Sequence, residues 1–187
     1  ADWVIAALRQ KGVQKYNLLG HSMGGMIVQD MARKDQGNID NLILYGTGAL
    51  GVLPGRFETI EQSKARAKQD GALKTARRIS ATWFLAGDAA SGYGACAAIA
   101  EHAAPEAIAA GLDAMRTWSG ENFLAQITPK TIVIWGDGDR TYSWEQTHLL
   151  WTSIPNAKLA VIPGCAHAVH AEKPALFNAV LMDHLSD

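Results

Sequence analysis

The sequence predicts an α/β fold: a parallel sheet of about four strands with flanking helices and a helical cap insertion. Two observations predict it. Short apolar runs that end at glycine or proline alternate along the chain with segments of helical apolar spacing. A long alanine-rich stretch between the second and third runs has a helical pattern and no strand-like run of its own. Because strands that alternate with helices favour parallel pairing, we expect one parallel sheet.

The first half of the sheet is expected from two apolar runs. Helical spacing over 4–8 ends at Gly12 and leads into the run 16–19, which we predict to be a strand. A glycine-rich turn and a helical pattern over 26–32 follow, and the next run, 41–45, ends at a glycine. The order is strand, tight turn, helix, strand.

The second half of the sheet is expected from two later runs, 131–135 and 158–162, and a final helix over about 174–185. At 187 residues the chain fits one domain of about 100–200 residues. We divide it into a core, residues 1–52 and 127–187, and the cap insertion, residues 53–126.

Composition and charge exclude several classes of partner. The net charge is -1, so no broad field steers the chain toward nucleic acid or an anionic membrane. No apolar run approaches the roughly 20 residues that span a bilayer, and the start of the chain lacks a signal-peptide pattern, so we expect a cytoplasmic protein. Cys96 and Cys165 lack metal-ligand spacing and are expected to be reduced thiols, and we expect no metal and no cofactor.

The turn after the first predicted strand carries a nucleophile pattern. Residues 20–24 read GHSMG and fit G-x-S-x-G, in which a serine sits on a sharp strand-to-helix turn. The expected strand before it and helix after it are the context that this motif requires. We predict that Ser22 is a nucleophile and that the backbone N–H of Met23, at the start of the helix, binds an oxyanion.

A serine nucleophile needs a base, and the chain has 6 histidines. His167 is the preferred base because it follows the last strand at the carboxyl edge of the sheet, where α/β sheets place their sites. His21, inside the turn, and His170 are expected to line the substrate pocket. The other histidines are expected to be packed or solvated: His102, His148 and His184.

The base needs a carboxylate, and the third strand runs into two of them. Asp137 and Asp139 both follow it in WGDGDR, and either gives the chain order Ser, Asp, His. We prefer Asp139 and keep Asp137 as the alternative.

Three segments, GHSMGG, WGDGDR and PGCAHAVHAEKP, resemble the nucleophile, acid and histidine segments of capped α/β-hydrolases, a group of carboxylesterases, enol-lactonases and carbon–carbon bond hydrolases. The resemblance implies a triad of Ser22, Asp139 and His167. It also implies several strands before the nucleophile turn and an early loop that supplies a second oxyanion donor. Here one helix and one strand precede Ser22, so the chain is expected to be a fragment or a truncated α/β-hydrolase fold. Losing one such donor costs roughly 100- to 1000-fold in rate.

We expect an esterase that acts on a small-molecule ester. Trp83 and Trp118 in the cap insertion are expected to contribute apolar pocket surface. The alternatives on the same triad are hydrolysis of lactones, hydrolysis of carbon–carbon bonds and perhydrolysis. Ala168 counts against carbon–carbon bond hydrolysis, because similar enzymes of that kind often carry tryptophan directly after the histidine. A non-enzymatic binding or assembly module is the alternative of another class. The edge of the strand over 16–19 is expected to pair two subunits in a homo-oligomer.

Overall fold

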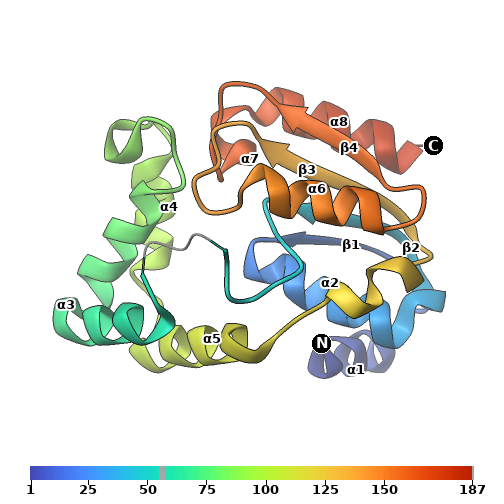
Figure 1. Cartoon of the computed structure of the whole chain (residues 1–187), viewed down its shortest axis with the longest axis horizontal. Coiled ribbons are helices and arrows are strands. Elements are labelled where there is room, and N and C mark those ends of the chain that lie inside the picture. Colours follow the sequence, from blue (N-terminus) through green and yellow to red (C-terminus); the bar gives the residue numbers. More distant parts are fainter. Residues whose placement is uncertain (55–57, 187) are drawn as a thin grey trace.

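The computed structural model describes residues 1–54 and 58–186, and in it helices cover both faces of a four-stranded parallel sheet (Figure 1). The strands lie in the order β1-β2-β3-β4. Their bounds are β1 Tyr16–His21, β2 Ile39–Tyr45, β3 Lys130–Gly136 and β4 Lys158–Ile162. The predicted α/β class and parallel four-strand sheet are confirmed.

β1 is longer than the sequence pattern predicted. It continues through Gly20 and His21, which pair with Leu44 and Tyr45 of β2. The prediction ended the strand before Gly20, but Gly20 is inside the ladder. It must be glycine because a side chain there would overlap the carbonyl oxygen of Gly24 in the following helix. The longer strand carries the chain to the carboxyl edge of the sheet, directly before Ser22.

The helices form two layers. α1 (Asp2–Gln10), α2 (Met23–Asp35) and α6 (Trp144–Ser153) lie on one face, and α7 (Val169–Glu172) and α8 (Pro174–Ser186) lie on the other (Figure 1). The short helix α7 was not predicted.

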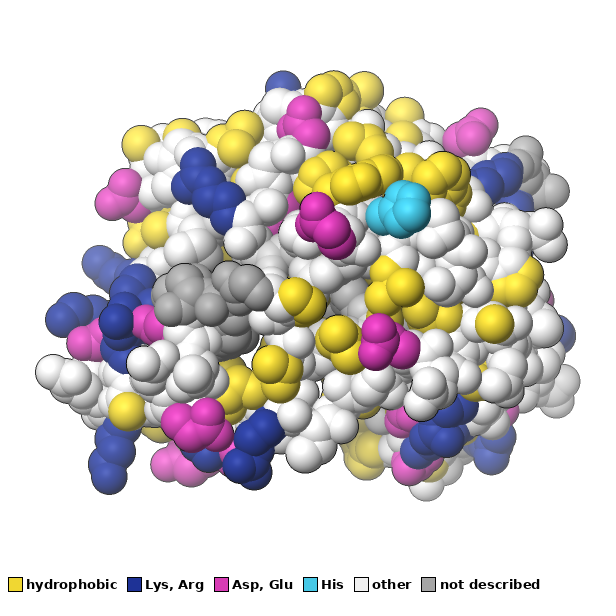
Figure 2. Space-filling model, in the orientation of Figure 1, with side chains coloured by type: hydrophobic (Ala, Val, Ile, Leu, Met, Phe, Trp, Pro, Cys, Tyr) yellow, Lys and Arg dark blue, Asp and Glu magenta, His cyan; other side chains and the backbone are white. Residues whose placement is uncertain are grey.

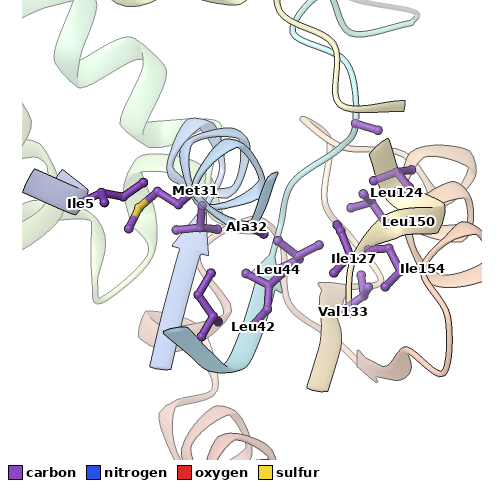
Figure 3. Close-up of a cluster of buried hydrophobic side chains, with 13 residues drawn as sticks. Ile5, Met31, Ala32, Leu42, Leu44, Leu124, Ile127, Val133, Leu150 and Ile154 are labelled. Atoms are coloured by element: carbon purple, nitrogen blue, oxygen red, sulfur yellow. The ribbon is translucent and has the colours of Figure 1, made fainter. Parts of the chain in front are cut away.

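β2 shows how one strand builds both layers. Side chains alternate between the two faces of a strand. Leu42 and Leu44 therefore point into the cluster around Met31 and Ile154, on the side of α2 and α6 (Figure 3). Ile43 and Tyr45, which alternate with them along the strand, face the α8 side and pack in the second cluster.

The regular elements described within the cap insertion are all helical, and one isolated bridge joins its Ser119 to Leu50 of the core. Its helices are α3 (Ile60–Ala81), α4 (Tyr93–Ala100) and α5 (Pro105–Thr117), and they lie to one side of the sheet (Figure 1). α3 bends at Gly71, whose φ of 76° is one that residues with a Cβ rarely adopt. The division into a core and a cap insertion stays a prediction.

β1 forms one edge of the sheet in the described part of the chain, and Leu19 on it is 43% exposed. Pairing of two subunits through this edge also stays a prediction. Acidic and basic side chains are interspersed over the face in Figure 2, in keeping with the net charge of -1. None of the helices seen in the described residues combines the length and the apolar character needed to cross a bilayer.

Candidate active site

Ser22 lies between the end of β1 and the start of α2, in a backbone conformation that few residues with a side chain adopt. Its φ is 56° and its ψ is -123°. Such strain costs about 1–3 kcal/mol and persists where the surrounding structure enforces it. Here the flanking glycines are required, because a Cβ at Gly20 would overlap Gly24 and one at Gly25 would overlap the Thr47 side chain.

Two hydrogen bonds fix the backbone of this serine, one to the end of β2 and one to the turn that follows it. The Ser22 N–H donates to the carbonyl oxygen of Tyr45 at 3.1 Å. The hydroxyl of Thr47 donates to the Ser22 carbonyl oxygen at 2.7 Å. Met23 is the first residue of α2, so its N–H has no acceptor within the helix and carries part of the positive end of the helix dipole.

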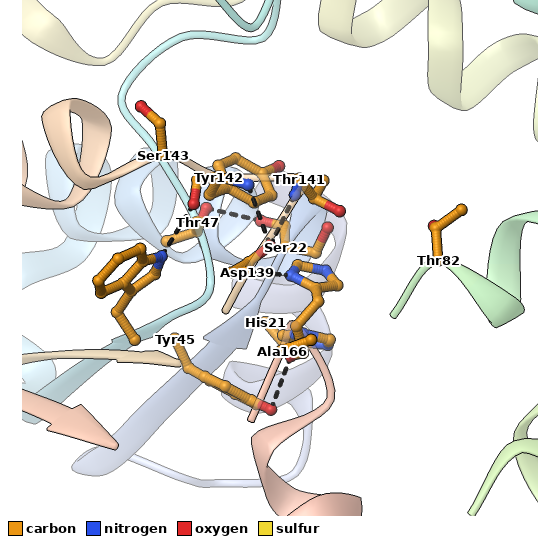
Figure 4. Close-up of polar contacts among 12 residues, drawn as sticks. His21, Ser22, Tyr45, Thr47, Thr82, Asp139, Thr141, Tyr142, Ser143 and Ala166 are labelled. Carbon is orange, nitrogen blue, oxygen red and sulfur yellow. Dashed lines mark hydrogen bonds and ion pairs between the residues drawn. The ribbon is translucent and has the colours of Figure 1, made fainter. Parts of the chain in front are cut away.

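His167 and Asp139 form a buried pair at the same edge of the sheet. Nδ1 of His167 lies 2.8 Å from Oδ2 of Asp139, and the two side chains are 1% and 0% exposed. The other carboxylate oxygen accepts from the N–H groups of Thr141 at 2.7 Å and Tyr142 at 3.1 Å (Figure 4). A carboxylate accepts only, so Nδ1 of His167 carries the proton in this pair and Nε2 is left to accept one.

The second acidic candidate has a different partner. Oδ1 of Asp137 accepts the N–H of Gly164 at 2.8 Å, which joins the loop after β3 to the loop after β4. The structure therefore brings Asp139, and not Asp137, to His167.

Tyr45, at the end of β2, holds the loop that carries His167. Its hydroxyl donates to the carbonyl oxygen of His167 at 2.9 Å and accepts from His170, whose backbone N lies at 3.2 Å and whose Nδ1 lies at 3.0 Å. Nε2 of His21 lies 3.1 Å from the same carbonyl oxygen, and the His21 ring packs 4.3 Å from both the Tyr45 and the His167 rings. Sequence reasoning missed Tyr45 because it closes an apolar run and reads as core.

A cavity of about 290 Å³ lies beside Ser22 and Met23. Trp83 lines it, as the sequence led us to expect. Tyr142 also lines it and stacks on the ring of His167 at 5.6 Å, so the imidazole, which is 1% exposed, lies behind the Tyr142 side of the cavity. Within the described chain no hydrogen bond joins the Ser22 hydroxyl to His167. Such contacts are often long without substrate and tighten when it binds.

Three of the four expected pocket residues lie elsewhere. His21 and His170 are not among the described residues that line the cavity, because their rings are engaged by Tyr45 and the His167 loop. Trp118 follows the end of α5 and, with Met26, lines a neighbouring hollow that shares Met23 with the cavity beside Ser22. Across the described residues, no group of three or more His, Cys, Asp or Glu side chains is placed to hold a metal ion.

His21 makes the fold sensitive to acid. Burial, and then the neighbouring His167, lower the pKa of His21 from 6.5 to about 3. Above about pH 6.5 the ring is neutral in both the folded and the unfolded chain. Between that pH and about 3 the unfolded chain takes up a proton that the folded chain excludes, so the free energy of unfolding falls by up to about 1.4 kcal/mol per pH unit.

We expect that the His21→Gln variant, measured by urea unfolding at pH 7 and pH 4.5, loses less stability on acidification than the unmodified chain, by about 1–2 kcal/mol. An equal loss in both proteins would contradict the burial of a neutral ring at this position.

Comparison with known proteins places the chain in a family. The family model described as alpha/beta hydrolase fold matches residues 1–174. The 2-hydroxy-6-oxo-6-phenylhexa-2,4-dienoate hydrolase of Burkholderia cepacia is 27% identical over 94% of this chain, and the chain spans 64% of the length of that relative. An esterase from Exiguobacterium antarcticum (TM-score 0.88, 19% identity, 98% of this chain and 71% of that one) shares the fold. So does the enol-lactonase from Burkholderia xenovorans LB400 (TM-score 0.86, 21% identity, 98% of this chain and 70% of that one). The chain belongs to the α/β-hydrolase fold family.

Proposed function

We propose that this chain hydrolyses carboxylic esters through an acyl-enzyme intermediate on Ser22, with His167 as general base and Asp139 as the acid that orients it. One observation carries the proposal: a buried His167–Asp139 hydrogen bond of 2.8 Å beside a serine held at a φ of 56°. Nucleophilic acyl transfer needs a serine nucleophile and a histidine base that a buried carboxylate orients.

The reaction proceeds in two transfers of one acyl group. The Ser22 hydroxyl oxygen attacks the ester carbonyl carbon while Nε2 of His167 takes its proton, and the Met23 N–H stabilises the resulting oxyanion. The C–O bond to the alcohol breaks, and the alcohol leaves with the proton from His167. Water then attacks the acyl-serine by the same route and releases the acid and the free serine. Asp139 keeps the proton on Nδ1 throughout and stabilises the transient imidazolium.

Labelling by a fluorophosphonate probe tests the nucleophile directly, because the probe reacts with an activated serine. We expect stoichiometric labelling of Ser22, mapped by mass spectrometry, together with hydrolysis of 4-nitrophenyl butyrate. Ser91→Ala changes an exposed serine outside the site and should leave both signals intact. If the folded chain takes up no label and hydrolyses no ester, it is a binding or assembly module and the proposal is wrong.

A second candidate is carbon–carbon bond hydrolysis on the same residues. The activity named for the Burkholderia cepacia relative favours it. Ala168 after the base counts against it for the reason given above. Release of a carboxylic acid from a vinylogous 1,5-diketone, with nitrophenyl esters left intact, would favour this second candidate.

A further inference from the structure

Two polar side chains of α3 line the cavity that contains Ser22. They are Thr75 and Arg78. Residues three apart on a helix share one face, so the hydroxyl and the guanidinium are neighbours on the wall that α3 presents to the cavity.

Both side chains have a polar atom that is hidden from solvent and lacks a hydrogen-bond partner among the described residues. These atoms are the hydroxyl oxygen of Thr75, a residue only 5% exposed, and Nε of Arg78. Folded proteins leave few such groups unpaired, because a buried donor without an acceptor is costly. Each side chain thus carries an unsatisfied polar atom behind the cavity wall, and a ligand oxygen would satisfy it once the side chain turns toward the cavity.

The charged residue in this wall indicates the charge of the ligand. Arg78 is the one residue with a formal charge among the described residues that line the cavity. Asp70 is its ion-pair partner, but the Nε to Oδ2 distance is 3.8 Å, too long for a hydrogen bond. Asp70 also lies 3.3 Å from the ammonium of Lys74. Asp70 is thus shared between two cations, and the Arg78 guanidinium keeps an Nε–H without a hydrogen-bond partner among the described residues.

The remaining wall of the cavity suits a short hydrocarbon chain. Its apolar members include Leu53, Ile79, Ile108 and Leu112. The volume of about 290 Å³ lies just below the roughly 300–1,000 Å³ typical of small-molecule sites. The cavity is thus lined by Ser22, by apolar side chains and by Arg78.

We infer that Arg78 and Thr75 bind a carboxylate at the far end of the substrate, so that the preferred esters are half-esters of short dicarboxylic acids. The inference rests on the proposed ester hydrolysis at Ser22. Arginine suits the task because its planar fork matches a carboxylate and its charge is permanent. Thr75 donates a further hydrogen bond to the same anion.

The test compares two esters that differ only at the far end, monomethyl adipate and methyl hexanoate. We expect kcat/KM to be higher for monomethyl adipate. In Arg78→Gln the ratio of the two kcat/KM values should fall about 10- to 100-fold, mainly through KM, as for loss of a hydrogen bond to a charged group. Thr75→Val, which keeps the shape and removes the hydroxyl, should lower the ratio by a smaller factor. Arg78→Lys, which keeps the charge, should retain part of it.

Arg77→Gln is the matched control. Arg77 is the preceding residue of the same helix, its side chain is 61% exposed, and it pairs with Glu101 outside the cavity. Its loss should leave the ratio unchanged, which separates carboxylate binding from a general effect of charge on α3.

Binding to the Ser22→Ala variant supplies a readout that needs no turnover. Isothermal titration should show that this variant binds monomethyl adipate more tightly than methyl hexanoate, and that adding Arg78→Gln removes the difference. If the unmodified chain hydrolyses neither ester, the proposed function fails, while the titration still decides the carboxylate site. Equal affinity for both esters, or a selectivity ratio that Arg78→Gln leaves intact, would overturn the inference.

Discussion

Ser22→Ala and His167→Ala are each expected to abolish ester hydrolysis, with kcat falling about 10⁴- to 10⁶-fold toward the uncatalysed rate. Without the hydroxyl there is no atom to acylate, and without the imidazole no group removes the serine proton. Because the two residues act as one unit, the double variant should be no slower than either single variant. Initial rates with 4-nitrophenyl butyrate, corrected for spontaneous hydrolysis, measure this.

Melting temperatures must show that these variants still fold, and the contacts of each residue indicate the change to expect. Alanine at position 22 is held at the same φ of 56° as serine, so the strain is unchanged and the melting temperature should stay close to that of the unmodified chain. His167 packs against the rings of His21, Tyr142 and Trp83, so its alanine variant should melt at a lower temperature. His167→Gln, which fills more of the space, controls for that. Retention of a tenth or more of the activity in Ser22→Ala would contradict the nucleophile assignment.

Local pattern was enough to predict the sheet and the residues that meet at its carboxyl edge. Four apolar runs predicted four strands, and parallel strands end at one edge, so the loops after β1, β3 and β4 had to meet there. The G-x-S-x-G spacing predicted the turn at Ser22. Of its two glycines, Gly20 is required because a Cβ there would overlap Gly24, whereas a Cβ at Gly24 would meet nothing within 4 Å. Asp137 and Asp139 follow the same strand, and in the structure Asp139, which the sequence analysis preferred, is the one in contact with His167, at 2.8 Å.

The surroundings of the site could not be read from the sequence, because they depend on which neighbour each side chain meets. His21 looked like a pocket residue beside the serine. Its ring instead stacks on Tyr45, which faces the α8 side of the sheet through the alternation of β2. Trp118 is displaced from the cavity by the path of the chain after α5, and that path depends on packing of the cap insertion. No motif in the sequence singled out Thr75 and Arg78, which the structure places at the cavity on α3.

The two aspartates after β3 provide the sharpest test of the proposed chemistry. Asp139→Asn is expected to lower kcat about 10⁴-fold, and Asp137→Asn is expected to cost little. In Asp139→Asn the remaining carbonyl oxygen is held by the N–H groups of Thr141 and Tyr142, so the new amide group points its hydrogens at Nδ1 of His167. That nitrogen must then accept, the ring proton moves to Nε2, and Nε2 can no longer remove the serine proton.

The matched change at Asp137 lacks this consequence. Asparagine there keeps an oxygen that can accept the N–H of Gly164, so the two loops stay joined and the His167 tautomer is untouched. Steady-state rates of both variants with 4-nitrophenyl butyrate, and their melting temperatures, separate chemistry from folding. Because the amide is isosteric with the carboxylate, the Asp139→Asn protein should melt as a folded domain even though it is inactive. A damaging Asp137→Asn change beside a mild Asp139→Asn change would reverse the assignment and transfer the orienting role to Asp137.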